Sequence, residues 1–194
     1  TVYDDFSSTA LGWSIRDNDT ATTGYESGGY ALLVKQPTYW VMSKTAGDFA
    51  PMAMEFDATV TPGSSSGMYG VICHYRNGDN YDFLSVDPET LSISAARYVG
   101  GKFAYVTKGP DGVAELPSNG LAHEVNAANH IRAVCHNDRL ELTVNDVLEG
   151  AWPLDPPADG GNGALFVYGF GTMGEQGYKV IFDNFAAWRD APAP

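Results

Sequence analysis

Apolar and polar residues alternate most clearly between residues 52 and 60. One side of this run carries Met52, Met54, Phe56, Ala58 and Val60. The other side carries Glu55, Asp57 and Thr59. Because successive side chains of a β-strand point to opposite faces, this period of two predicts a strand with one face in a core and one face in solvent.

Similar short runs recur along the whole chain, separated by turn-forming residues. Besides 52–60, we expect strands over residues 1–6, 30–34, 39–43, 68–76, 81–86, 91–99, 102–108, 130–136, 139–145, 164–170 and 178–188. Three pairs of them flank tight-turn sequences, at 77–80, Gly100-Gly101 and Asn137-Asp138, which favour hairpins. Consecutive hairpins with one apolar face each predict two packed antiparallel sheets.

The domain organisation that we expect is simple. A length of 194 residues suits one all-β domain, which we place at 1–189, with 190–194 as a Pro/Ala linker. Residues 109–120 and 153–163 are rich in Gly, Pro, Asp and Asn and predict long surface loops. The stretch 121–129 is too short and too poorly patterned for more than a turn of helix.

The net charge of the chain restricts the classes of molecule that it could bind. Acidic residues outnumber basic ones, 24 to 11, for a formal net charge of −13. Such a surface repels nucleic acid and anionic lipid, and no apolar run reaches the roughly 18–20 residues that span a bilayer. We therefore expect neither nucleic-acid binding nor membrane insertion. Solubility explains most of the acidic excess, and neutral ligands such as sugars are compatible with it.

The two cysteines lie in expected strands. Cys73 alternates with Val71 and Tyr75, and Cys135 alternates with Ala133, so both are expected to face the interior. Neither has a second cysteine or a histidine at zinc-binding spacing. A disulfide, which suits a secreted protein, and two buried free thiols are both open.

Several segments together resemble the concanavalin A-like lectin and glucanase superfamily. In chain order they are Asp4-Asp5-Phe6, Gly12-Trp13, 70–76 with Asn80-Tyr81, 129–135, 140–145 and 182–185. The branch that they most resemble is the laminin-G-like domains of bacterial extracellular and cell-surface proteins. The resemblance implies a two-sheet antiparallel jelly-roll sandwich located outside the cell or at its surface. It does not choose among lectins, glycoside hydrolases, carbohydrate-binding modules and protein-binding domains.

Hydrolases that resemble this fold carry their two carboxyl groups on one strand, as Glu-x-Asp-x-x-Glu or Glu-x-Asp-x-Glu. The nearest match is Glu55-Phe56-Asp57, and Thr59 or Val60 stands where the second glutamate would be. We therefore expect no glycosidase activity and interpret Glu55 and Asp57 as part of a solvated strand face.

Nucleophilic catalysis is not indicated either. The sequence has no Gly-x-Ser-x-Gly elbow. No pattern pairs a histidine with a cysteine or a serine. We expect single surface residues at His74, His123, His130 and His136.

The resemblance also implies a structural calcium. In the modules that this chain resembles, the N- and C-terminal strands often lie side by side, and here they carry Asp4-Asp5 and Asp183-Asn184. Carboxylates are ligands that calcium prefers, so Asp5 and Asp183 are the candidate ligands. The alternative is that they cap backbone amides. The loop 17–19 is a second candidate, although it lacks the Gly-x5-Glu continuation of an EF-hand.

A sugar site needs rings on which a sugar stacks and planar polar groups that bind its hydroxyls. Residues 74–82 have this composition. The candidate ligand-binding residues are Tyr75, Arg76, Asp79, Asn80, Tyr81, Trp40 and Tyr168. Two alternatives stay open: the rings belong to the core, and Arg76 with Asp79 forms a surface pair.

The function that we infer from the sequence is a non-catalytic extracellular module that binds a glycan or a cell-surface partner. One alternative is a structural subunit of a surface layer, filament or larger assembly, which would self-associate. The other is a glycoside hydrolase whose carboxylate pair the sequence pattern does not reveal.

Overall fold

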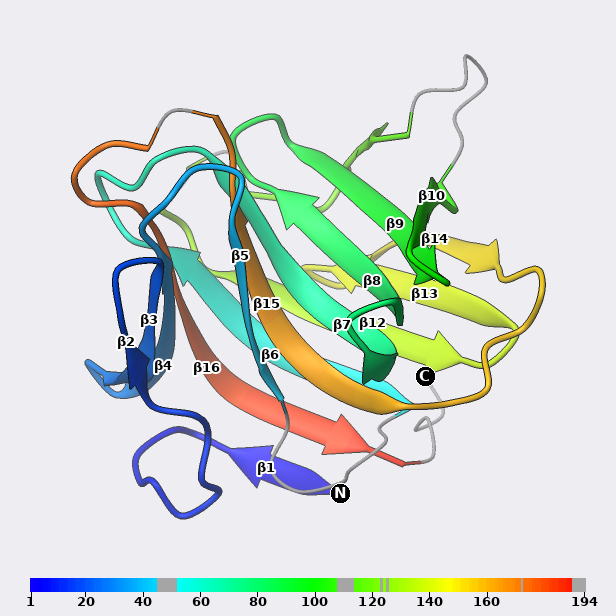
Figure 1. Ribbon diagram of the computed structural model, residues 1–194, viewed down its shortest axis with the longest axis horizontal. Coiled ribbons are helices and arrows are strands. Elements are labelled where there is room, and N and C mark those ends of the chain that lie inside the picture. Colours follow the sequence, from blue (N-terminus) through cyan, green and yellow to red (C-terminus); the bar gives the residue numbers. More distant parts are fainter. Residues whose placement is uncertain (45–51, 108–113, 123, 125, 172, 190–194) are drawn as a thin grey trace.

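The computed structural model describes residues 1–44, 52–107, 114–122, 124, 126–171 and 173–189. These residues form two stacked antiparallel sheets and no helix (Figure 1). The predicted all-β sandwich is therefore confirmed. Within the described ranges there is also no helix of the length and hydropathy needed to cross a membrane. The expected linker at 190–194 lies outside the described residues.

We name the two layers sheet A and sheet B. In spatial order, sheet A contains β14 (Val147–Pro153), β13 (Arg139–Val144), β12 (Asn129–His136), β6 (Ala53–Val60), β16 (Tyr178–Trp188), β4 (Gly29–Val34), β3 (Ala21–Glu26) and β2 (Arg16–Asp17), and β1 (Val2–Asp4) pairs with the C-terminal part of β16. Sheet B contains β10 (Lys102–Tyr105), β9 (Ser92–Val99), β8 (Asn80–Asp87), β7 (Gly67–Asn77), β15 (Asn162–Gly169) and β5 (Trp40–Lys44), and β11 (Leu116–Pro117) pairs with β9.

The three predicted hairpins are present. The turns join β7 to β8, β9 to β10 and β12 to β13. At the second turn, Gly100 and Gly101 have φ values of 57° and 74°. Only glycine adopts this left-handed region without steric cost, which is why the glycine pair sets the turn.

The core lies between the inner faces of the two sheets. The predicted apolar side of β6 faces it, and the side chains of Met54, Phe56, Ala58 and Val60 are buried. From sheet B, alternate residues of β7 and β8 meet them. Burying one such apolar side chain stabilises the fold by about 1.5–3 kcal/mol.

The alternation of β7 is interrupted at His74. This residue has a φ of 52°, and the pairing of β7 with β8 shifts between Cys73 and Asn77. Counted from the paired residues, β7 contains one residue more than β15 and two more than β8 at this bulge, and the following side chains turn over. Cys73 thus faces the core, as predicted, whereas Tyr75 packs on the outer face with Ile72. The expectation that Tyr75 shares a face with Cys73 is wrong for this reason.

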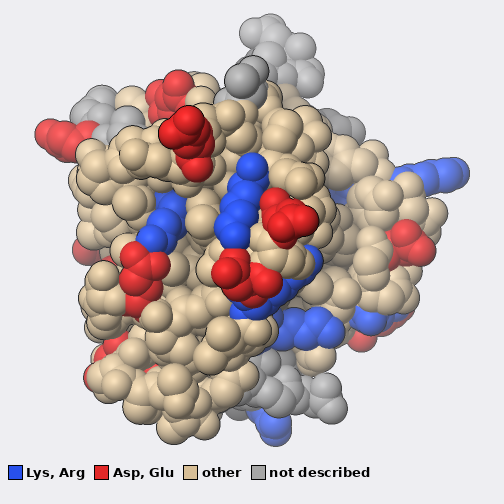
Figure 2. Space-filling model, turned by 60° about the vertical axis from the view of Figure 1, so that its left-hand side comes forward, with Lys and Arg blue, Asp and Glu red and all other residues tan. Residues whose placement is uncertain are grey.

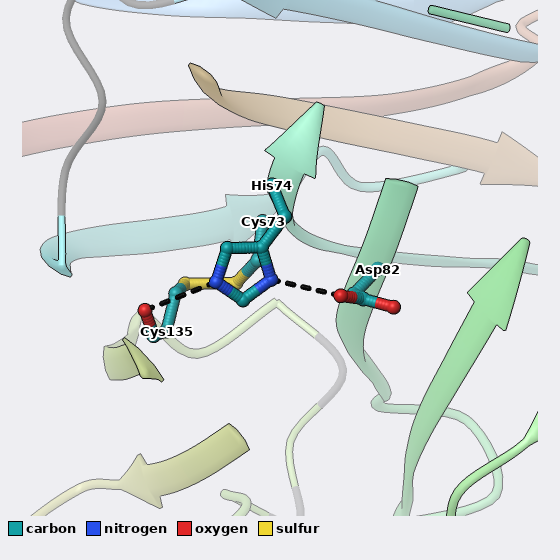
Figure 3. The surroundings of a disulfide bond; sticks show 4 residues. All are labelled: Cys73, His74, Asp82 and Cys135. Atoms are coloured by element: carbon teal, nitrogen blue, oxygen red, sulfur yellow. Dashed lines mark hydrogen bonds and ion pairs between the residues drawn. A yellow bond between two sulfur atoms is a disulfide. The ribbon is translucent and has the colours of Figure 1, made fainter. Parts of the chain in front are cut away.

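A disulfide joins the two sheets beside the bulge. It links Cys73 of β7 to Cys135 of β12, whose Cα atoms are 5.8 Å apart. Figure 3 shows His74 next to it, with the ring between Asp82 and the backbone of Cys135. His74 Nδ1 is 2.8 Å from Asp82 Oδ2, and Nε2 is 3.2 Å from the Cys135 carbonyl oxygen. Arg97 Nε donates to the other Asp82 oxygen at 2.8 Å.

This network corrects the expectation of single surface histidines. His74 is 6% exposed. His130 contacts Asp57 and Glu55 on the outer face of sheet A. His136 Nε2 lies 3.0 Å from Arg139 Nη2, from which it accepts a hydrogen bond, and 3.6 Å from Glu141 Oε1. The partners of these histidines lie elsewhere in the sequence, and strand pairing brings each histidine and its partners together. His123 lies outside the described residues.

Surface charge is sparse and mixed. Charged residues make up 18% of the chain, and on the face shown in Figure 2 basic and acidic side chains lie next to one another within wide uncharged areas. Among the ion pairs of the described residues is that of Lys35 with Asp17, at 2.6 Å. An exposed pair of this kind stabilises the fold by less than about 1 kcal/mol. The visible face offers no continuous basic surface for an anionic polymer.

We expect the protein to lose stability at alkaline pH because of two tyrosines in its core. Burial raises the pKa of Tyr69 and of Tyr178 above the usual 10.0. Unfolding returns each pKa toward 10, so the unfolded state gains from ionisation of the phenols only above pH 10. The free energy of unfolding is therefore unaffected below pH 10 and falls as the pH rises toward the pKa of the folded protein. We expect the free energy of unfolding to fall by about 1.4 kcal/mol per pH unit for each phenol. Urea unfolding of wild type and Tyr178→Phe above pH 10 checks this, and equal slopes would contradict it.

Candidate functional site

The outer faces of the two sheets differ in chemistry. On sheet A the outer face is polar, as expected for an antiparallel sheet with its other face in a core. His130 illustrates this face: its Nδ1 is 2.7 Å from Asp57 Oδ1, and its Nε2 is 3.2 Å from Glu55 Oε1. Asn184 Nδ2 also donates to Asp57, at 2.7 Å.

The outer face of sheet B is apolar instead. A cluster separate from the main core is buried on it, formed by Ile72, Phe83, Ala96, Ala164 and Phe166. Partly buried side chains surround this cluster: Trp40, Met42, Met68, Tyr75, Tyr81, Tyr105 and Tyr168. In the described part of the chain no third layer covers this face. A large apolar surface that a soluble protein leaves uncovered marks an interaction site.

These side chains line a groove of about 380 Å³, which we call the aromatic groove. Its lining residues are Trp40, Met68, Ile72, Tyr81, Phe83, Phe103, Tyr105, Glu115, Phe166, Tyr168 and Phe170. They come from β5, β7, β8, β10 and β15 and from the segments that follow β10 and β15. Residues on five paired strands hold their rings in fixed relative positions, because the ladders set the spacing.

The rings form a continuous row. The Trp40 and Tyr81 centroids are 5.8 Å apart at an interplanar angle of 25°, and those of Tyr81 and Tyr98 are 5.3 Å apart at 20°. Tyr75 adds a further contact, with its centroid 6.3 Å from that of Tyr81, and Lys44 Nζ lies 4.6 Å from the centre of the Tyr75 ring. Because these rings stack on one another, the row presents the apolar ring surface that remains exposed, with the tyrosine hydroxyls at its edges.

The polar groups of the aromatic groove are few. Burial raises the pKa of Tyr81, and the neighbouring Tyr98 and Tyr75 add to this effect. Burial also raises the pKa of Tyr105, helped by the Glu115 carboxylate. Both phenols are therefore neutral at physiological pH and are able to donate hydrogen bonds. A few oriented polar groups on an apolar floor are typical of small-molecule and oligosaccharide sites.

The sequence-selected ligand residues divide into two groups. Trp40, Tyr81 and Tyr168 line the aromatic groove, and Tyr75 packs against Tyr81. The polar three, Arg76, Asp79 and Asn80, are not among its lining residues. Asn77 Oδ1 accepts hydrogen bonds from the Asp79 amide and from Asn80 Nδ2, so these residues shape the hairpin turn.

Arg76 does form a surface pair, but its partner differs from Asp79, which the open alternative named. Arg76 donates to Asp159 at 2.8 Å. Asp159 belongs to the long loop that precedes β15, 83 residues further along the chain. No short-range pattern in the sequence could have indicated this partner.

The aromatic groove also contains residues that the sequence analysis missed. Phe83, Phe166 and Met68 belong to strands that are apolar on both faces. The signal for Phe166 was the near-continuous apolar run in 164–168, which is typical of a strand with two buried faces. Glu115 had no such signal, because it lies in an irregular segment that only the fold brings to β10.

The candidate calcium ligands lie on neighbouring strands. β1 pairs with β16, with Asp4 opposite Phe185 (Figure 1). The buried Asp4 carboxylate accepts hydrogen bonds from the Phe6 amide and from Trp13 Nε1. Asp5 accepts one from the Ser7 amide, and Asp183 accepts one from the Asn184 amide.

In these contacts the three carboxylates cap backbone amides, so few carboxylate oxygens are left to coordinate a metal ion. Among the described residues no three His, Cys, Asp or Glu side chains gather in a way that could hold a metal ion. The described side chains therefore do not fit a calcium site built from protein carboxylates. Calcium binding by Asp5 and Asp183 stays a prediction of the sequence resemblance.

No family model and no curated protein matches the chain, but solved structures share its fold. The carbohydrate binding module CBM66 from Bacillus subtilis is 15% identical, with a TM-score of 0.66 over 90% of this chain and 93% of that one. A Bacillus licheniformis β-glucanase is 13% identical, with a TM-score of 0.66 over 95% of each chain. A Bacteroides ovatus mixed linkage glucan GH16 protein is 9% identical, with a TM-score of 0.63 over 95% of this chain and 98% of that one. At these identities the likeness shows the fold alone, a concanavalin-like jelly roll.

Proposed function

We propose that this protein is a non-catalytic module that binds a neutral glycan in the aromatic groove of sheet B. The observation that carries the proposal is the partly exposed row of rings in which Trp40 and Tyr81 line the groove and Tyr98 stacks on Tyr81. Sugar rings expose apolar C–H faces that pack on aromatic rings, while their hydroxyls bond to neutral phenols such as Tyr81 and Tyr105. The likeness to a carbohydrate binding module agrees with this role.

The distribution of carboxylates supports binding over hydrolysis. Hydrolysis of a glycosidic bond uses two carboxyl groups roughly 5–9.5 Å apart on either side of the bond. Of the described residues that line the aromatic groove, Glu115 alone is acidic. Glu55 and Asp57 lie on β6, on the outer face of the other sheet. Because two hydrolase-type structures share the fold, a glycoside hydrolase is the second candidate, and it would depend on Glu115.

The proposal includes a location. A disulfide between two sheets suits an oxidising compartment, so we place the protein outside the cell or at its surface. A glycan-bearing cell-surface protein would then be a natural partner, in keeping with the laminin-G-like resemblance. Self-assembly into a surface layer stays a prediction of the sequence.

Truncation of the Trp40 ring tests the proposal. We expect Trp40→Ala to weaken binding to a neutral polysaccharide about ten-fold, the equivalent of about 1.4 kcal/mol, because a stacking platform is lost. Affinity electrophoresis against a panel of neutral α- and β-glucans, mannans and fructans measures this. Glu55→Gln is the matched control on the polar sheet and should bind like wild type.

Two results would contradict the proposal. One is the absence of binding to every polysaccharide of the panel by the wild-type chain. The other is release of reducing sugar by wild type that Glu115→Gln abolishes, which would favour the hydrolase.

A further inference from the structure

A second pocket opens at one end of the sandwich, and we call it the serine pocket. It encloses about 350 Å³ and is lined by residues 64–67, which lead from β6 into β7, by Pro88 and Glu89 after β8, and by Tyr178 at the start of β16. Its walls thus carry three serine side chains, one carboxylate and one phenol. This composition differs from that of the aromatic groove, which is lined mainly by apolar rings.

Residues 64–67 form one wall of this pocket, which we call the serine wall, and hydrogen bonds hold it in place. The Ser65 amide donates to the Gly177 carbonyl at 2.7 Å, and Ser65 Oγ accepts from the Gly174 amide at 2.8 Å. The Ser66 carbonyl accepts from the Phe170 amide at 3.0 Å. The wall is therefore anchored at three points to the segment before β16, so that a ligand would meet a preformed surface.

Tyr178 supplies a hydroxyl that has no partner. Its side chain is 2% exposed, and its hydroxyl makes no hydrogen bond within the described residues. Leaving a buried hydroxyl unbonded costs about 1–3 kcal/mol. The ring lies tightly against Gly67, since a Cβ atom there would be 2.4 Å from Tyr178 Cδ1. A larger residue at position 67 would close this side of the pocket.

Tyr178 and Glu89 line the same pocket. Burial raises the pKa of Tyr178, and Tyr69, Asp87 and Glu89 raise it further, so the phenol is neutral at physiological pH. Asp87 itself is engaged, because its Oδ1 accepts from the amides of Glu89 and Thr90. Glu89 is exposed and is the one carboxylate among the described lining residues, so it is the charged acceptor that the pocket offers, and Tyr178 adds a neutral phenol to the same lining.

We propose that the serine pocket binds a single neutral sugar residue. Hydroxyl groups that both donate and accept match serine hydroxyls, and a carboxylate accepts from two adjacent sugar hydroxyls. Among the described lining residues no Lys or Arg would balance an anionic ligand, and Glu89 is the single carboxylate, too few for calcium. The class of ligand rests on the proposed function, but the site is separate from the aromatic groove.

An amide-resolved NMR titration tests this proposal with D-glucose, D-galactose, D-mannose and D-fructose as probes. We expect at least one of them to shift the amide signals of residues 64–67 and 89. Glu89→Gln should weaken the binding of that sugar about ten-fold, because a charge-assisted hydrogen bond is lost. Tyr178→Phe should also weaken it while the protein stays folded, since the hydroxyl makes no bond in the fold.

The controls separate the two sites. Trp40→Ala should leave the monosaccharide titration unchanged, and Glu89→Gln should leave polysaccharide binding in the aromatic groove unchanged. The proposal is overturned if none of the four sugars shifts these signals, or if Glu89→Gln and Tyr178→Phe titrate like wild type. Shifts produced by calcium chloride or sodium phosphate in place of the sugars would overturn the assignment to a neutral ligand.

Discussion

Replacing Asp82 by alanine should lower the free energy of unfolding by about 3–5 kcal/mol. The Asp82 side chain is 3% exposed and lies between His74 and Arg97, whose side chains are 6% and 12% exposed. Removal of Asp82 leaves the Arg97 guanidinium without its counter-charge and the His74 Nδ1 atom without its hydrogen-bond partner, and this costs far more than the interactions themselves contribute. Among the described residues, Arg97 would keep its bond to the Pro156 carbonyl.

Urea unfolding followed by far-ultraviolet circular dichroism measures the effect. The matched control is Asp159→Ala, which removes an aspartate of 80% side-chain exposure that pairs with Arg76, and it should cost less than about 1 kcal/mol. Asp82→Asn keeps the shape and should fall between the two. A loss below about 1 kcal/mol for Asp82→Ala would mean that water reaches this network.

Removing the disulfide should cost about 4 kcal/mol. The bond closes a loop with a sequence separation of 62 residues, and a cross-link of that span restricts the unfolded chain by about this amount in the chain-entropy model. Cys73→Ala with Cys135→Ala is the variant to use, because both positions are buried and apolar. The loss is measured as the difference in urea midpoint multiplied by the common slope.

Reducing agent provides the internal control. Reduced wild type should unfold at nearly the same urea concentration as the double alanine variant, and the variant should not respond to the reductant. If wild type keeps its midpoint under reducing conditions strong enough to open the bond, the two sheets are held by packing alone and the expected value is wrong.

The fold could be predicted from the sequence because its signals are local. β6 and the hairpins at Gly100-Gly101 and Asn137-Asp138 follow from alternation and turn chemistry. Strands without these signals were missed. β3 and β14 contain glycine within the strand, and β14 is partly exposed with a register shift on β13. β14 at one edge of sheet A and β3 next to the other edge form because neighbouring strands offer hydrogen bonds, and a single segment does not reveal its neighbour.

The candidate site could be predicted only in part, for a related reason. The sequence selected Trp40, Tyr81 and Tyr168 by composition, and all three line the aromatic groove. It also selected the polar residues beside Tyr81, which instead stabilise the turn. Composition gives the chemistry that a site requires, but the face on which a side chain lies depends on strand register. Glu115 and Phe166 are brought to Trp40 by contacts across the sheet that no local pattern contains.

Because β7 contains a bulge, the outer surface of sheet B depends on the number of residues in this strand and not only on which residues they are. His74 shifts the phase of the strand, so that Tyr75 joins the outer row of rings. Deleting one residue here would restore strict alternation and exchange inside for outside from this point to the hairpin. Insertions and deletions in this strand are therefore a route by which related sequences could replace the ring that packs against Tyr81 by a polar side chain without a single substitution.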